Sequence, residues 1–73
     1  MMAVTLELSA DYRGPQGRIV TDYHNHRLPS ITAALAVTDS TWQRVGRRRG
    51  TQLHVRITPD DGAPIVTRRF RRD

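Results

Sequence analysis

The chain contains no cysteine and no lysine, and it has few aromatic residues. Without cysteine, neither a disulfide nor a thiolate zinc site can stabilise the fold. At 73 residues the chain is near the lower size limit for a domain that folds alone. No apolar run has the length of a transmembrane helix, and the opening residues lack a signal-peptide pattern. We therefore expect one small domain, spanning residues 1–73, in the cytoplasm and with no membrane partner.

Positive charge is concentrated in the second half of the chain, and all of it comes from arginine. Residues 1–43 carry three arginines and four acidic residues, a net charge of −1, and residues 44–73 carry nine arginines and three acidic residues, a net charge of +6. A GC-rich genome alone can favour arginine, but its planar side chain also suits phosphate and guanine. The asymmetry predicts a polyanionic partner, with nucleic acid favoured over an acidic membrane.

The first thirty residues contain one clear strand and one ambiguous segment. Met2 to Ala10 alternates apolar and polar residues and indicates a half-buried strand. Arg13–Gly17 is either a turn or the approach to a helix that has Pro15 in its first turn. Residues 16–27 fit a helix, but they also fit a strand that returns as a hairpin onto the first one. We favour the helix, because the two short helices expected in residues 31–45 would need a supporting helix before them.

The segment ITAALAVTDSTWQRV, residues 31–45, has apolar residues spaced for two short helices joined by a tight turn. Ser30 is expected to cap the first helix and Thr38 the second. The segment resembles the helix-turn-helix of winged DNA-binding domains, whose core positions correspond to Ile31, Leu35, Val37, Trp42 and Val45. It departs from that family at Thr32, usually a small residue, at Ala36, usually the turn glycine, and at Trp42, usually a branched aliphatic residue.

The last third of the chain has the pattern of a β-hairpin, which the resemblance identifies as the wing. Residues 51–58 alternate, Pro59–Ala63 is a strong turn in which Gly62 is free to adopt a positive φ, and Pro64–Phe70 is the returning strand. Phe70 is expected to pack on Leu53 or Val55. The expected fold class is therefore α+β: an N-terminal strand, two or three helices with the helix-turn-helix at about 30–48, and a wing hairpin at about 51–71.

The resemblance implies that the second helix enters the major groove of DNA. Gln43 would then bind adenine, and Arg44 or Arg47 would bind guanine, while the arginines that follow hold the backbone. Arginines of the wing would add phosphate contacts. The expected DNA-binding residues are Ser40, Gln43, Arg44, Arg47, Arg48, Arg49, Arg56, Arg69 and Arg71.

The resemblance implies sequence-specific binding of double-stranded DNA, by a transcriptional regulator or a recombination factor of the excisionase kind. A marginal core and paired half-sites are reasons to expect a homodimer. The alternative is a basic adaptor of ββαββ layout that binds RNA or an acidic protein, such as an inhibitor of a host machine. No catalytic constellation or glycine-rich phosphate loop points to an enzyme, and no cofactor is expected. His24, His26 and His54 are expected to be surface residues and not zinc ligands.

Overall fold

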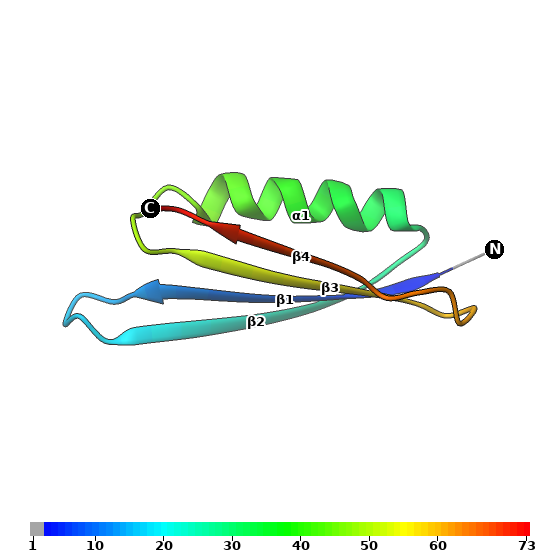
Figure 1. Cartoon of the computed structure of the whole chain (residues 1–73), viewed down its shortest axis with the longest axis horizontal. Coiled ribbons are helices and arrows are strands. Elements are labelled where there is room, and N and C mark those ends of the chain that lie inside the picture. Colours follow the sequence, from blue (N-terminus) through cyan, green and yellow to red (C-terminus); the bar gives the residue numbers. More distant parts are fainter. Residues whose placement is uncertain (1–2) are drawn as a thin grey trace.

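The computed structural model describes residues 3–73 and has the element order ββαββ. The elements are β1 (Val4–Arg13), β2 (Ile19–Leu28), α1 (Ile31–Val45), β3 (Gln52–Pro59) and β4 (Val66–Arg71). The strands form one antiparallel sheet in the order β2-β1-β3-β4. The helix lies lengthwise against one face of this sheet (Figure 1), and the molecule measures 45 × 17 × 16 Å.

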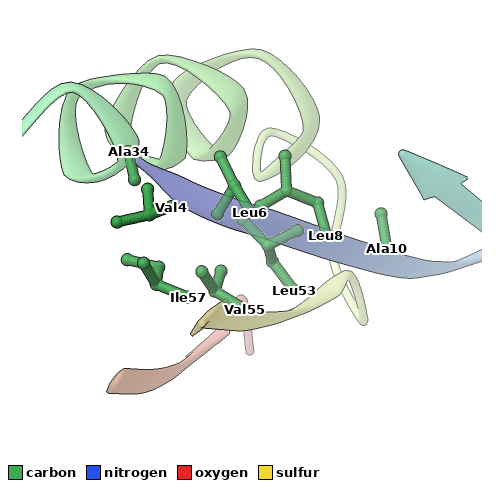
Figure 2. Packing of buried hydrophobic residues seen from close by; sticks show 8 residues of the cluster. All are labelled: Val4, Leu6, Leu8, Ala10, Ala34, Leu53, Val55 and Ile57. Carbon is green, nitrogen blue, oxygen red and sulfur yellow. The ribbon is translucent and has the colours of Figure 1, made fainter. Parts of the chain in front are cut away.

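The two central strands supply most of the hydrophobic core. In β1 and β3 every second residue is buried, and the register places Leu6 opposite Ile57 and Leu8 opposite Val55. Because the side-chain period of a strand is two, all these apolar residues point to the face that α1 covers. Figure 2 shows them gathered below the helix, where Ala34 is the buried apolar residue of α1. The two alternating strands expected from the sequence, at residues 2–10 and 51–58, are confirmed as β1 and β3. Met2, the expected first residue of the first strand, lies outside the described residues.

The expected helix-turn-helix is wrong, because α1 is one continuous helix. Thr38, the expected cap of a second helix, is buried in its middle and donates its hydroxyl hydrogen to the carbonyl oxygen of Ala34 at 2.8 Å. Neither glycine nor proline interrupts the segment, so nothing forces a turn at Ala36. The sequence pattern misled because the inward stripe consists of small or polar residues: Ala34, Thr38 and Thr41.

Both ends of α1 are defined by local contacts. Ser30 is the N-cap, as expected, and its Oγ accepts a hydrogen bond from the backbone N of Ala33 at 3.1 Å. At the other end Trp42 packs against the core and stacks on Phe70, with ring centroids 5.3 Å apart. Phe70 also lies opposite Leu53 in the sheet, which confirms that expected contact.

The helix favoured for residues 16–27 is also wrong, because this segment is strand β2. The hairpin loop contains the expected turn residues, and the backbone N of Gly14 donates to the carbonyl oxygen of Arg18 at 2.8 Å. Gly17 adopts a φ of 77°, which favours glycine. The β-branched and aromatic residues Ile19, Val20, Thr21 and Tyr23 fit a strand, and the neighbouring β1 gives them a backbone partner.

The C-terminal hairpin is confirmed as two strands, with Gly62 at a φ of 80°. It is not a wing beside a helical bundle, because β3 is a central strand that pairs with β1 on one side and β4 on the other. The expected fold of two or three helices with a wing is therefore replaced by a four-stranded sheet with one helix in the described chain, residues 3–73. This is the ββαββ layout of the alternative interpretation.

Candidate nucleic-acid interface

Most of the arginines lie at one end of the elongated molecule. The strand β1 ends there and β2 begins there, and the helix, which runs back along the sheet, also ends there (Figure 1). The C-terminal residues reach the same end, because Arg72 pairs through its backbone with Gly50 and Thr51. We call this region the arginine-rich end and define it by its exposed arginines: Arg13, Arg18, Arg44, Arg47, Arg48, Arg49, Arg71 and Arg72.

The loop that follows α1 presents the central arginines of this region. Gly46 ends the helix, and its backbone N donates to the carbonyl oxygen of Trp42 at 2.7 Å. Thr51 is fully buried and anchors the far side of the loop, where its backbone N donates to Arg48. Between these two anchors the side chains of Arg47, Arg48 and Arg49 are all exposed. The loop is therefore held at both ends while its charges face solvent.

Little negative charge offsets these arginines. The acidic residues at this end are Asp11, Asp22 and Asp73, against eight arginines. Among the ion pairs of residues 3–73, only Arg71 of this group has a carboxylate partner, Asp73, with its Nε 3.0 Å from the Oδ1. The guanidinium groups of the other seven are thus available to an external anion such as phosphate, which arginine binds with two parallel hydrogen bonds.

A shallow hollow of about 390 Å³ lies at this end on the helix side of the sheet. It is lined by Arg44, Arg47 and Arg48 from the helix and its loop, and by Tyr12 and Asp22 from the sheet. The Tyr12 hydroxyl donates to Asp22 Oδ2 at 3.0 Å, and this hydrogen bond is the main cause that raises the pKa of Tyr12. A phosphate in this hollow would meet three guanidinium groups and one carboxylate.

The structure divides the expected DNA-binding residues between two faces. Ser40 and Gln43 are exposed on α1, ahead of Arg44 in the arginine-rich end. Arg71 also lies at this end, but its pairing with Gln52 places it on the sheet face that α1 leaves open. Arg56 and Arg69 lie on this open face too, because Arg56 is opposite the exposed Glu7 and Arg69 is opposite His54. Arg56 and Arg69 therefore do not join the loop arginines on one surface.

Three members of the arginine-rich end, Arg13, Arg18 and Arg72, were not among the DNA-binding residues expected from the sequence. Arg13 and Arg18 flank the first hairpin turn, far in sequence from the loop arginines, and they join this end only because β1 and β2 form a hairpin. Arg72 lies just beyond the expected wing hairpin, which was given as about 51–71, and joins this end through its backbone pairing with Gly50 and Thr51. The hairpin alternative for residues 16–27 would have placed Arg13 and Arg18 together, but not beside the end of the helix.

The three histidines do not converge. His24 and His26 lie on the helix side of β2, opposite Leu8 and Leu6, whereas His54 lies on the open face, opposite Ser9. No group of three or more potential metal ligands comes together within the described part of the chain.

Comparison with family models, with curated proteins and with solved structures found no match for this chain. In the described residues, 3–73, no helix is both long and apolar enough to cross a membrane.

Proposed function

We propose that this chain is a nucleic-acid-binding domain without catalytic activity, and that its arginine-rich end binds the phosphate backbone of a duplex. The observation that supports this most directly is the gathering of eight exposed arginines from three separate parts of the chain at one end. Because the proposed ligand is nucleic acid, the compartment that we propose is the cytoplasm. Duplex DNA is the first ligand to test.

A duplex suits this surface better than a single strand. Proteins that bind single strands combine positive charge with aromatic side chains on which the bases stack. The aromatic ring in the hollow, Tyr12, is engaged with Asp22, while Trp42 and Phe70 stack on each other. Among the described residues, the arginine-rich end thus offers dense charge with few aromatic ring faces, which favours contacts to the backbone.

Base reading is a separate, finer part of the proposal. The loss of the helix-turn-helix removes the geometric reason for placing a recognition helix in the major groove. Gln43 and Arg44 nevertheless remain exposed on α1 beside the arginine-rich end, where a bound duplex would reach them. Selection of binding sites from a random pool by wild type, Gln43→Ala and Arg44→Ala tests this part. Identical selected sites from all three proteins would show that α1 does not read bases.

The main experiment compares two double charge reversals that change the net charge equally. Arg47→Glu with Arg48→Glu alters the arginine-rich end, and Arg56→Glu with Arg69→Glu alters the open sheet face. Binding to duplex DNA, duplex RNA and a single strand is measured across a salt series. We expect the first pair to weaken duplex binding strongly and to reduce the salt slope by about 0.9 for each phosphate contact that is lost.

The second pair is the matched control, because it removes the same charge from the open sheet face, away from the loop that carries Arg47 and Arg48. We expect it to have the smaller effect on affinity and on the salt slope, since only long-range attraction is reduced. Equal losses from both pairs would mean that binding follows total charge and not this surface. Tighter binding to the single strand than to either duplex would reject the duplex as the ligand.

A further inference from the structure

The strand β2 has the features of an interface that lacks its partner. It is an outer strand of the sheet, ten residues long, and nearly every one of its residues is exposed. Its exposed side chains include large apolar ones, since Tyr23 is 76% exposed and Ile19 is 64% exposed. Long outer strands are open to pairing with another chain unless proline, lysine, a bulge or a covering element protects them. No proline or lysine occurs in β2, and α1 lies over the central strands instead.

The hairpin geometry identifies the backbone groups that face outward from β2. Gly14 donates its N–H to Arg18, so these two residues form a hydrogen-bonded pair. In an antiparallel ladder such pairs alternate, and the even-numbered residues of β2 therefore direct their N–H and C=O groups towards β1. The odd-numbered residues direct theirs to the free edge: Ile19, Thr21, Tyr23, Asn25 and Arg27.

This edge is complementary to itself in one register. If two β2 strands pair antiparallel with Tyr23 opposite Tyr23, the outward groups of both strands match along most of their length. Thr21 then lies opposite Asn25, and Asp22 lies opposite His24, twice by symmetry. An aromatic pair at the centre is flanked by carboxylate–imidazole pairs, and both kinds of cross-strand pair are favourable. Shifting the register by one step places either two Asp22 carboxylates or two His24 rings opposite each other.

The other outer strand, β4, does not have this property. The ladder from β3 leaves Thr67, Arg69 and Arg71 with outward backbone groups. In an antiparallel pair of β4 strands, centring on Arg68 or on Arg69 brings two copies of that arginine directly together. Like charges in this position are destabilising, and they protect the edge. The positive charge thus disfavours self-pairing at β4, whereas the mixed side chains of β2 permit it.

We propose that two copies of this chain pair through their β2 strands, with Tyr23 at the twofold axis, to form a continuous eight-stranded sheet. The axis is perpendicular to the sheet, so both helices lie on the same face and the two arginine-rich ends point in opposite directions. The floor between the helices is then the helix side of the two β2 strands. This proposal does not depend on the nucleic-acid function.

The first test measures the mass in solution across a concentration series by light scattering. We expect the chain of 8.3 kDa to form a species of twice that mass. Asn25→Pro removes an outward N–H without breaking a bond to β1, and Thr67→Pro does the same at the edge of β4. Asn25→Pro should raise the dimer dissociation constant about tenfold or more, because symmetry removes two hydrogen bonds, and Thr67→Pro should leave it unchanged. A monomer at every concentration, or dissociation by Thr67→Pro alone, would overturn the proposal.

The second test reads the register and does not require a proline variant to fold. The chain has no cysteine, so one introduced thiol is the only one present. We expect a disulfide between chains when Asp22→Cys and His24→Cys proteins are mixed and oxidised, because these positions face each other closely in a non-hydrogen-bonded pair. Neither variant should cross-link efficiently by itself. Cross-linking of Asp22→Cys alone or of His24→Cys alone indicates a shifted register, and no preference for the mixture rejects the pairing.

Discussion

The neighbouring strands β1 and β2 have the same length, ten residues, and very different surroundings. In β1 every second residue as far as Ala10 is buried under α1, whereas nearly all of β2 is exposed on both faces. The cause is the position of the helix, which packs on β1 and β3 and extends little over β2. The strand β2 thus forms through its backbone hydrogen bonds to β1, without a buried face of its own. The hydrophobic core lies between α1 and the central strands β1 and β3.

Polar side chains supplement the backbone ladder between these two strands. Thr21 donates its hydroxyl hydrogen to Asp11 at 2.7 Å, and Arg27 donates from Nη1 to Thr5 at 3.0 Å. Arg27 also forms an ion pair with Asp60, at the end of the molecule opposite the arginine-rich end. Such exposed contacts contribute little each, since water competes for the same groups. Most of the stability therefore resides in the central strands, while the side chains of β2 remain exposed.

Truncating a core residue of β1 tests this division most strongly. Leu6 is fully buried between α1 and β3, so Leu6→Ala should lower the free energy of unfolding by about 2–5 kcal/mol. The matched truncation on β2 is Tyr23→Ala, which should change the stability of the isolated chain by less than about 0.5 kcal/mol. Urea denaturation at low protein concentration measures both. A comparable loss from the two variants would show that β2 contributes to the core.

Removing the cap of α1 should produce the next largest effect, because this helix is what distinguishes the covered strands from β2. Ser30→Ala deletes the hydrogen bond to Ala33 and should cost about 1 kcal/mol. Ser40→Ala, at an exposed position within the helix, is the control and should be neutral or slightly stabilising. Equal unfolding midpoints for both variants would mean that the cap is not important for keeping the helix on the sheet.

The sequence predicted those elements whose pattern is local. Val4, Leu6 and Leu8 alternate, as do Leu53, Val55 and Ile57, and both strands formed where one apolar face needed cover. Ser30 was recognisable as a cap because its hydroxyl acts within one turn. The strand β2 could not be recognised from burial, since its exposed side chains carry no apolar alternation. Its β-branched and aromatic residues suit a strand, and the pairing with β1 supplies the hydrogen-bond partner that the sequence does not show.

The single helix α1 was also not predicted from the sequence, because its most buried positions are not large apolar residues. A buried stripe of Ala34, Thr38 and Thr41 looks polar or neutral in sequence, so the apolar residues on either side of it were assigned to two helices. The candidate site was predicted in part for a similar reason. The adjacent arginines of the loop are visible in the sequence, whereas Arg13 and Arg18 join them only through the sheet topology.

A smaller effect distinguishes the two outer strands. Strand β4 contacts the core through Phe70, which stacks on Trp42, whereas β2 has no such aromatic contact among the described residues. A double-mutant cycle with Trp42→Leu and Phe70→Leu should give a coupling energy of about 0.5–1.5 kcal/mol. Additive losses would indicate that the rings are near neighbours without specific interaction, and the contrast between the two edges would then be weaker.

The smallest predicted effect concerns the side-chain contact between Tyr12 of β1 and Asp22 of β2. The hydrogen bond to Asp22 raises the pKa of Tyr12 above its ordinary value of 10.0, and the nearby charge of Arg48 opposes this shift. In a Tyr23→Phe background, absorbance of tyrosinate during a pH titration reports Tyr12 alone. Asp22→Asn should lower the pKa of Tyr12, because it removes the negative charge that disfavours the phenolate.

The sign of the linked stability follows from this shift. The folded state holds the Tyr12 proton more tightly than the unfolded state does, so the contribution to stability is fully present below the unfolded pKa. It is lost as the pH rises through the higher pKa of the folded state. Asp22→Asn should therefore make the unfolding midpoint less dependent on pH in the alkaline range, and Asp11→Asn is a control that leaves the Tyr12 contact in place. An unchanged titration of Tyr12 in Asp22→Asn would mean that this contact does not join β1 and β2 in solution.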